Sequence, residues 1–307
     1  MHDLIIVGGG PAGAAAAVYA ARKRLKTILI TNEWGGQSNV SADIENWIGT
    51  PHISGADLAK NLKAHVDAHV GESLSTASGK VASLESSASS VSVTLSNGTK
   101  YEARTLLVAT GSERRKLEVP GAAQYDQKGL TYCATCDGPL FDGQDVVVVG
   151  AGNAAFESAL QLLAYCKTVT LLNRTETFRA DEVTVEAARS NPKMRILNNT
   201  IPTEVIGEQF VKGMKIKNVQ TDEESTLDVT GIFIEIGLIP NTDWLGTTVP
   251  LNATKQVIVD PMTQRTNNAR IWAAGDCTSG LYHQNNIAAG DAVKALEDIY
   301  LFVRKDK

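Results

Sequence analysis

Two cysteines with two residues between them, followed by an aspartate, form the part of this sequence best suited to chemistry. The segment reads Cys133-Ala134-Thr135-Cys136-Asp137, and sulfurs at this spacing can close a small disulfide ring or bind a metal ion. A zinc site needs a second pair of ligands, whereas the remaining cysteines, Cys166 and Cys277, are solitary. We therefore favour a redox-active dithiol and expect no metal site. The carboxyl group of Asp137 is placed to exchange a proton with a leaving thiolate.

A glycine-rich segment near the N-terminus has the spacing of a dinucleotide-binding turn. Gly8, Gly10 and Gly13 follow the apolar run DLIIV and precede an alanine-rich stretch. In such a turn the first glycine permits a tight bend, the second admits a pyrophosphate, and the third lets the helix pack closely on the strand. The helix N-terminus then offers free N–H groups to the phosphates. The strand before the motif and the helix after it favour dinucleotide binding over a plain turn.

A second segment of the same kind begins at Gly150 and continues through Gly152 to Ala155, again between an apolar run and a helical stretch. Two such turns imply two dinucleotides, which suits a flavin and a nicotinamide. An acidic residue at the end of the next strand would bind a ribose hydroxyl, and an arginine there would accept a 2′-phosphate. The sequence has Asn173 and Arg174 at that place, with Arg179 nearby. This favours NADPH, and the alternative is that both arginines are solvated surface charges.

Composition excludes several other classes of protein. The chain has 307 residues, with 29 Lys and Arg against 34 Asp and Glu, so it lacks the basic surplus of a nucleic-acid-binding protein. Residues 4–21 are uncharged and approach the length of a membrane span, but the glycines at their centre would break a helix exposed to lipid. We therefore expect a cytoplasmic protein that spans no membrane and contains about two domains.

The elements that must position these motifs follow from the hydrophobic pattern. Apolar runs at 3–7, 27–30, 106–109, 145–149, 169–172 and 271–274 predict strands, and the segments 12–24, 55–69, 153–165 and 285–303 predict helices. The β-turn-α-β pattern therefore occurs twice. The serine-rich segment 72–105, with its Asn97-Gly98 turn, predicts a small antiparallel meander.

The motifs together resemble those of the low-molecular-weight thioredoxin reductases, over essentially the full chain. The segment Tyr132–Gly138 resembles that family's active-site motif, and the segments Gly35–Gln37 and Glu45–Trp47 resemble its flavin loops. Ala109-Thr110-Gly111 and Ala273–Asp276 resemble its later FAD motifs. The stretches DIENW, TYCATCDGPLF and GIFIEIGLIPNTDWL also resemble the catalytic portion of the alkyl hydroperoxide reductase flavoprotein. That relative carries an additional N-terminal disulfide domain, and we expect the electron acceptor of this chain to be a separate protein instead.

The resemblance implies an α/β fold with two Rossmann-like FAD/NAD(P)-binding domains of the three-layer ββα type, the second inserted into the first. Because FAD motifs occur at both ends of the chain, we predict an FAD-binding domain at 1–114 and 244–307, and an NAD(P)-binding-like domain with the CxxC site at 115–243. The family also implies a homodimer.

The resemblance also assigns roles to individual residues. FAD would be held by the pyrophosphate turn, the flavin loops, a ribitol-binding aspartate and the start of the last helix; these residues are Gly8, Gly10, Pro11, Ala12, Gly13, Gly36, Gln37, Asn46, Ala109, Thr110, Gly111, Gly275, Asp276, His283 and Gln284. The nicotinamide nucleotide would be held by Gly150, Gly152, Asn153, Ala155, Arg174 and Arg179.

The implied reaction is a relay of electrons from NAD(P)H through FAD to a Cys133–Cys136 disulfide, and then to a thioredoxin-like protein. Cys136 would face the flavin, and Cys133 would attack the partner's disulfide. The donor stays open between NADPH, NADH and a ferredoxin, because the family's usual His-Arg-Arg run is Asn173-Arg174-Thr175 here and the acid of the NADH-using relative is absent as well. In a separate departure, His283 replaces a basic residue. A flavin-dependent thiol oxidase and a non-enzymatic flavoprotein are the alternatives.

Overall fold

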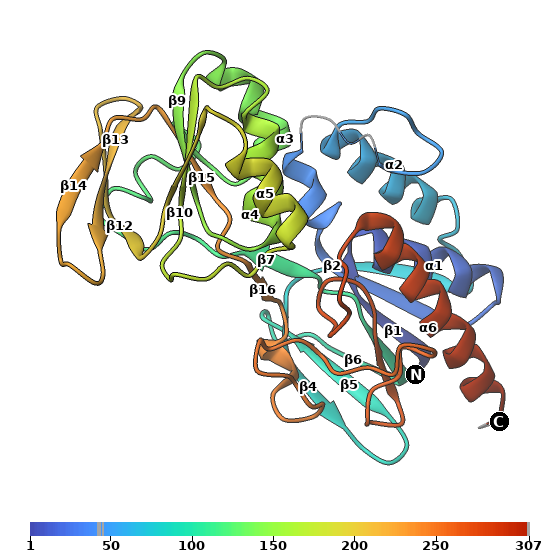
Figure 1. Cartoon of the computed structure of the whole chain (residues 1–307). Coiled ribbons are helices and arrows are strands. Elements are labelled where there is room, and N and C mark those ends of the chain that lie inside the picture. Colours follow the sequence, from blue (N-terminus) through green and yellow to red (C-terminus); the bar gives the residue numbers. More distant parts are fainter. Residues whose placement is uncertain (42–43, 45, 306–307) are drawn as a thin grey trace. The chain divides into compact units, whose positions relative to one another are not determined.

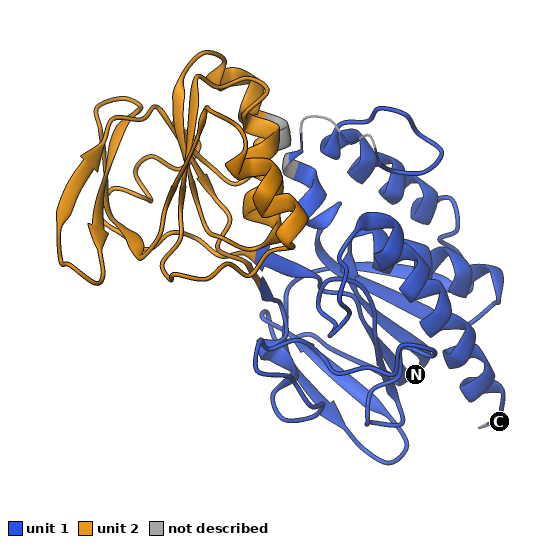
Figure 2. Cartoon of the chain, in the orientation of Figure 1, with its two compact units in different colours: residues 1–113, 239–307 blue, residues 114–238 orange. Residues whose placement is uncertain are grey.

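The chain folds into two compact units. The structure is a computed structural model that describes residues 1–41, 44 and 46–305, apart from the side chains of residues 40, 135 and 136. Unit 1 contains residues 1–113 and 239–307, and unit 2 contains residues 114–238 (Figures 1 and 2). Unit 2 is therefore an insertion in the chain of unit 1.

The second boundary lies five residues before the predicted position of 243. Asn241 belongs to unit 1 because its N–H donates to the carbonyl of Gly111 (3.0 Å), and its carbonyl accepts from the hydroxyl of Thr110 (2.7 Å). Leu245 is fully buried in the core of the same unit. These contacts tie the segment that follows Leu238 to unit 1.

Unit 1 is built on a sheet with the strand order β3-β2-β1-β6-β5-β4, in which β17 also pairs with β6. The pairs β1–β2, β1–β6, β2–β3 and β6–β17 are parallel, and β4–β5 and β5–β6 are antiparallel. The predicted meander is thus correct for β4–β6 and wrong for β3, which joins the parallel part through β2. The strands are β1 (His2–Gly9), β2 (Thr27–Trp34), β3 (Leu74–Ser78), β4 (Val81–Ser86), β5 (Val91–Leu95), β6 (Lys100–Val108) and β17 (Ile271–Ala273).

The α-helices in the described part of this unit are α1 (Pro11–Arg22), α2 (Gly55–Asp67) and α6 (Asn285–Lys305). Pro11 occupies the first turn of α1, where its missing N–H costs nothing. Ser54 caps α2 by accepting a hydrogen bond from the N–H of Asp57 (3.1 Å). Two short 3-10 helices, η1 (Gly36–Val40) and η3 (Asp243–Leu245), lie in the loops.

The core of unit 1 has two sides, because alternate residues of a strand point to opposite faces. Leu4 and Ile6 of β1 pack with α1 and α6, while Ile5 and Val7 pack with the meander and the segment after residue 243. Small alanine side chains on α1 let α6 approach closely, and both helices cover the same side of the sheet (Figure 1).

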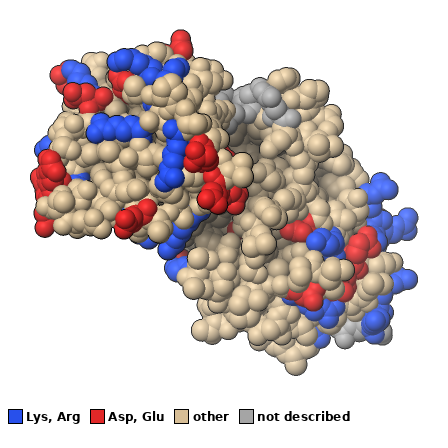
Figure 3. All heavy atoms as spheres, viewed as in Figure 1, with Lys and Arg blue, Asp and Glu red and all other residues tan. Residues whose placement is uncertain are grey.

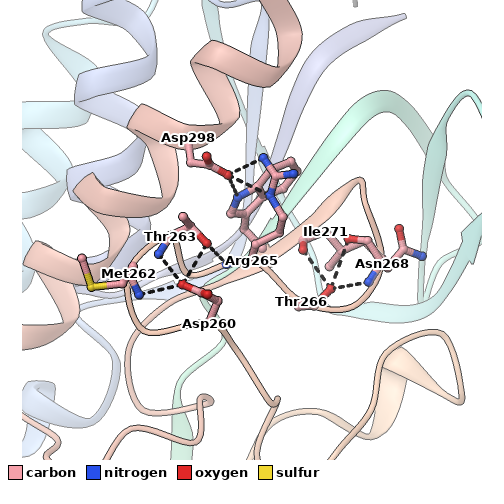
Figure 4. A network of polar contacts seen from close by, with 9 residues as sticks. Asp260, Met262, Thr263, Arg265, Thr266, Asn268, Ile271 and Asp298 are labelled. Atoms are coloured by element: carbon pink, nitrogen blue, oxygen red, sulfur yellow. Dashed lines mark hydrogen bonds and ion pairs between the residues drawn. The ribbon is translucent and has the colours of Figure 1, made fainter.

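A partly buried ion pair fixes α6 to the strand beside it. One carboxylate oxygen of Asp298 accepts hydrogen bonds from Nε (2.9 Å) and Nη2 (2.6 Å) of Arg265 and from Nε1 of Trp272 (2.8 Å) (Figure 4). Charge-assisted bonds of this kind hold their groups in a defined geometry. The contact therefore anchors α6, which begins at Asn285, against β17.

Unit 2 contains a second parallel sheet, with the order β11-β10-β9-β15-β8. Its strands are β8 (Leu130–Thr131), β9 (Asp145–Val149), β10 (Thr168–Leu172), β11 (Met194–Leu197) and β15 (Gly231–Ile234). One face packs on α4 (Asn153–Leu162) and α5 (Glu182–Arg189). The other packs on an antiparallel sheet of β12 (Thr200–Gly207), β13 (Val211–Asn218) and β14 (Glu224–Leu227). Two sheets and a layer of helices confirm the predicted fold class.

Strand β9, which leads into the Gly150 turn, lies in this parallel sheet between β10 and β15, two strands that come later in the chain. From β9 the chain passes to β10 on one side, while β15 pairs on the other side. Ligands of such sheets bind outside the carboxyl ends of the strands where the strand order reverses.

The two connections between the units are β7 (Ser112–Arg114) and β16 (Leu238–Pro240), which pair with each other. The short helix α3 (Ala134–Asp137) and η2 (Gly138–Phe141) follow β8.

Candidate active site

The first glycine turn has the backbone geometry that the sequence predicts. Gly8 has φ +125°, and a Cβ at this position would lie 2.0 Å from the carbonyl oxygen of Ala109. A Cβ on Gly13 would lie 1.8 Å from the carbonyl oxygen of Gly8, whereas one on Gly10 would meet nothing within 4 Å. Two glycines are therefore required by the fold, and the open space at Gly10 is available to a ligand.

A cavity of about 750 Å³ opens beside this turn, entirely within unit 1. It is lined by many of the residues predicted to hold FAD, namely Gly8, Gly10, Pro11, Ala12, Gly36, Gln37, Ala109, Thr110, Gly111, Gly275 and Asp276. Gly13 lies behind the turn, and Asn46, His283 and Gln284 lie outside this lining. The fold thus brings the two ends of the chain to one cavity.

Asn46 and Gln284 contact each other instead. Nδ2 of Asn46 donates to Oε1 of Gln284 (3.1 Å), and Nδ2 of Asn286 donates to the carbonyl of Asn46 (2.7 Å). The flavin loop predicted around Asn46 is therefore attached to the first turn of α6. Glu45, in the same predicted motif, lies outside the described residues.

Several further residues to which the sequence reasoning gave no role also line the cavity, among them Glu33, Lys80, Ser112 and Asn241. Glu33 stands twenty residues after Gly13, which is the spacing of the acid that binds a ribose. The same rule that we applied to the second glycine turn could have found it. Lys80 and Asn241 have no comparable signal, because only folding brings them to the cavity.

The lining fits FAD in two respects. The hydroxyl of Ser112 is buried at the cavity and has no hydrogen-bond partner among the described residues, which is unusual unless a ligand or water supplies one. The N-terminus of α1 opens at Gly10, where its N–H groups suit a pyrophosphate.

His283 and Asp276 lie close together near this cavity. Nδ1 of His283 lies 3.5 Å from Oδ1 of Asp276, a distance at the limit of a hydrogen bond. The neighbouring carboxylate raises the pKa of His283, against the effect of burial.

The residue that follows Asp276, Cys277, is completely buried, and this burial raises the pKa of its thiol to about 11. It is therefore an unreactive thiol.

The second glycine turn repeats the first in unit 2. Gly150 has φ +134°, and a Cβ there would lie 2.1 Å from the carbonyl oxygen of Glu235. Above Gly152 the nearest atom is the carbonyl oxygen of Arg179, at 3.7 Å from a hypothetical Cβ, so this position is open. Ala155 is fully buried. The turn therefore fits a nucleotide pyrophosphate.

Of the residues predicted to select the nucleotide after β10, one has a buried side chain that holds its loop, and two have exposed side chains. Asn173 is buried; its Nδ2 donates to the carbonyl of Thr177 (3.1 Å) and to Oδ1 of Asn198 (3.3 Å), and its Oδ1 accepts from the N–H of Thr175 (3.2 Å). It holds its own loop and is not available to a ribose. Arg174 and Arg179 are exposed. The side chain of Asn153 accepts from the N–H of Asp181 (2.7 Å), which ties the loop to α4.

The CxxC segment lies after β8, and Cys133 is disulfide-bonded while Cys166 and Cys277 are free. The N–H of Asp137 donates to the carbonyl of Cys133 (3.1 Å). The buried hydroxyl of Thr131 donates to the carboxylate of Asp137 and accepts from the N–H of Cys133 (3.4 Å). Asp137 is thereby oriented beside the cysteine backbone. The side chain of Cys136 lies outside the description.

Charge on one face of the surface and the grouping of metal-ligating residues were considered as signs of a further site among the described residues. On the face drawn in Figure 3, acidic and basic side chains are interspersed on each unit. Within the described part of the chain, no cluster of three metal-ligating residues occurs. Among the described helices, none is both long and apolar enough to cross a membrane.

Comparison with known proteins agrees with this arrangement. The family model "pyridine nucleotide-disulphide oxidoreductase" matches residues 2–292. Among curated proteins, a component of alkyl hydroperoxide reductase from Staphylococcus aureus is 38% identical over 98% of this chain. The chain spans 59% of the length of that relative.

Solved structures of similar proteins cover nearly the whole chain. Thioredoxin reductase from Lactococcus lactis, in the FR conformation, has a TM-score of 0.81 at 32% identity, over 99% of this chain and 100% of its own. Thioredoxin reductase from Streptococcus pyogenes has a TM-score of 0.78 at 33% identity, over 99% of both chains. The fold, the two glycine turns and these matches show that the chain belongs to the pyridine nucleotide-disulphide oxidoreductase family.

Proposed function

We propose that the protein is an FAD-dependent dithiol–disulfide oxidoreductase that passes electrons from a reduced nicotinamide, by way of FAD, to a Cys133–Cys136 disulfide and then to a thioredoxin-like protein. The observation that carries this proposal is the disulfide-bonded Cys133, with Asp137 oriented beside it. When bound, FAD supplies the two-electron chemistry that links hydride donors to disulfides.

The residues of unit 1 bind and orient the FAD. The turn from Gly8 to Gly13 holds the pyrophosphate at the start of α1, and Glu33 is placed for the adenosine ribose. Asp276 and the first turn of α6 face the rest of the FAD molecule. The Asp298 contact helps to keep α6 in place.

The cysteines carry the exchange with the partner. As a thiolate, Cys133 attacks one sulfur of the partner's disulfide and forms a mixed disulfide, while the partner's other sulfur leaves as a thiolate. Cys136 then attacks the sulfur of Cys133, which releases the reduced partner and restores the internal disulfide. Asp137 provides the proton that a leaving thiolate takes up.

We propose NADPH as the electron donor, bound at the Gly150 turn of unit 2. The support is that Asn173 occupies the place of a ribose-binding acid but points into its own loop, while Arg174 and Arg179 are exposed near the strand end. Arginine recognises a phosphate group with bidentate geometry. NADH and a ferredoxin are the competing donors.

A disulfide protein of a peroxide-reducing system is the second candidate for the partner. It is favoured by the 38% identity to a component of alkyl hydroperoxide reductase. The homodimer and the cytoplasmic location stay predictions from the resemblance.

Anaerobic reduction of the FAD-loaded protein tests the donor. Addition of NADPH should bleach the flavin absorbance faster than addition of NADH or of reduced ferredoxin. Reduction of the flavin by a dithiol but by neither nicotinamide, together with oxygen consumption when the dithiol assay is repeated in air, would instead identify a thiol oxidase. Failure of every donor would contradict the enzymatic assignment.

A further inference from the structure

A partly buried carboxyl group stands at the nucleotide turn of unit 2, and the electron relay gives it no role. Glu235 directly follows the last residue of β15. Its N–H donates to the carbonyl of Val149 (2.8 Å), and its own carbonyl lies against Gly150. Its side-chain Oε1 accepts a hydrogen bond from the hydroxyl of Ser158 on α4 (2.7 Å).

This carboxyl group is poorly compensated. Burial raises its pKa, and the negative charge of Glu157 on α4 acts in the same direction. The hydrogen bond from Ser158 and the positive charge of Arg114 on β7 oppose that rise. Among the described ion pairs none includes Glu235, so no cation neutralises it directly. An uncompensated carboxylate in a partly buried place interacts strongly with any charge that comes near.

The strand order of unit 2 decides which part of a bound nucleotide comes near Glu235. The pyrophosphate lies over the Gly150 turn, at the start of α4. The end of β10, where Asn173 and Arg174 stand, takes the adenosine side of the nucleotide. Because β10 and β15 lie on opposite sides of β9, the other half of the nucleotide extends toward β15. Glu235 is at the end of that strand.

We propose, on the basis of the nicotinamide site argued above, that Glu235 makes this site prefer the oxidised nucleotide to the reduced one. The oxidised nicotinamide ring carries a positive charge, and the reduced ring is neutral. A carboxylate beside the ring attracts the positively charged oxidised ring and has little electrostatic attraction for the neutral reduced ring. The preference favours the donation of hydride by the bound nucleotide, because it stabilises the product of that step.

The test compares two ligands on the oxidised, FAD-loaded protein: NADP⁺ and its tetrahydro analogue, which is neutral at the ring and cannot donate hydride. The variant Glu235→Gln keeps an oxygen that accepts the Ser158 hydrogen bond, so the fold should be retained. The matched control is Glu186→Gln, which removes the same charge from an exposed site on α5. Affinities are measured by equilibrium dialysis, so the readout does not depend on turnover.

We expect Glu235→Gln to weaken NADP⁺ binding about tenfold and to change binding of the neutral analogue by no more than about twofold. The control should change neither. The wild-type preference for NADP⁺ should decline as the pH falls through the raised pKa of Glu235, and the variant should show no such decline.

Three outcomes contradict the proposal in different ways. Equal strengthening of both ligands by Glu235→Gln would mean that the carboxylate faces the pyrophosphate. Unchanged affinities would mean that the carboxylate faces neither the nicotinamide ring nor the pyrophosphate. If the wild-type protein bound neither the NADP nor the NAD forms of the ligands, the nicotinamide site itself would be wrong, and this inference would fail with it.

Discussion

The hydroxyl of Thr131 donates a hydrogen bond to the carboxylate of Asp137, six residues along the chain, and accepts one from the N–H of Cys133. A hydroxyl has a single proton to donate, so this geometry fixes which way the proton points. The orientation of the proposed proton donor therefore depends on a residue outside the CxxC motif.

Loss of the Asp137 carboxyl should slow the exchange between thiol and flavin. We expect Asp137→Asn to lower this rate by about 100-fold, the usual effect of removing a general acid, with FAD content unchanged. Thr131→Val should cause a smaller loss, and Thr131→Ser should restore the rate. Stopped-flow absorbance of the flavin measures all three. A rate for Asp137→Asn equal to that of the wild type would remove Asp137 from the mechanism.

Two glycines of the same turn should respond differently to an added methyl group. Gly13→Ala places a Cβ 1.8 Å from a backbone oxygen, and overpacking of this kind costs about 1–3 kcal/mol of stability. Gly10→Ala meets nothing within 4 Å and should fold normally, but it should bind FAD more weakly because the methyl group occupies the ligand's space. Thermal unfolding and FAD content separate the two effects. Normal FAD content in Gly10→Ala would show that the pyrophosphate lies elsewhere.

Arg174 should distinguish the two nicotinamide donors. If it contacts a 2′-phosphate, Arg174→Ala should lower kcat/KM for NADPH by about tenfold or more and leave the value for NADH unchanged. Arg195→Ala, an exposed arginine on the neighbouring strand β11, serves as the control. An equal loss with both donors, or no loss, would count against this role.

The contact between His283 and Asp276 should make stability depend on pH. Because Asp276 raises the pKa of His283, protonation favours the folded state. The stabilisation is complete below the ordinary pKa of 6.5 and is lost as the pH rises through the raised value. His283→Gln should therefore lower the denaturant midpoint at about pH 6 and have little effect at about pH 9. A difference that is the same at both pH values would contradict the pairing.

Most of the fold followed from the sequence, because the two glycine turns and the strands beside them are local patterns. Their geometric consequences, such as the close approach of Gly13 to Gly8, are properties of a strand–turn–helix unit. The predicted antiparallel place of β3 was wrong for a non-local reason: the segment's own alternation does not say which strand it will pair with.

The site was predictable only where residues act through motifs. Lys80 and Asn241 reach the cavity through folding alone. Asn173 illustrates a second limit, because its place after the strand showed only that a ribose-binding acid is missing there, whereas its hydrogen bonds show a loop-holding role. Glu235 lies in the stretch GIFIEIGLIPNTDWL, which resembles a segment of a relative, but no motif gave it a role, and that role became visible only from its contacts with Gly150 and Ser158.

The most direct test of the account is the number of reducing equivalents that the protein accepts. Anaerobic titration of the FAD-loaded wild-type protein with NADPH should require about two equivalents, one for the flavin and one for the disulfide, whereas Cys133→Ser should require about one. The variant should keep its reducible flavin and should fail to reduce a thioredoxin. Equal consumption by the two proteins, or normal reduction of thioredoxin by Cys133→Ser, would contradict the proposed relay.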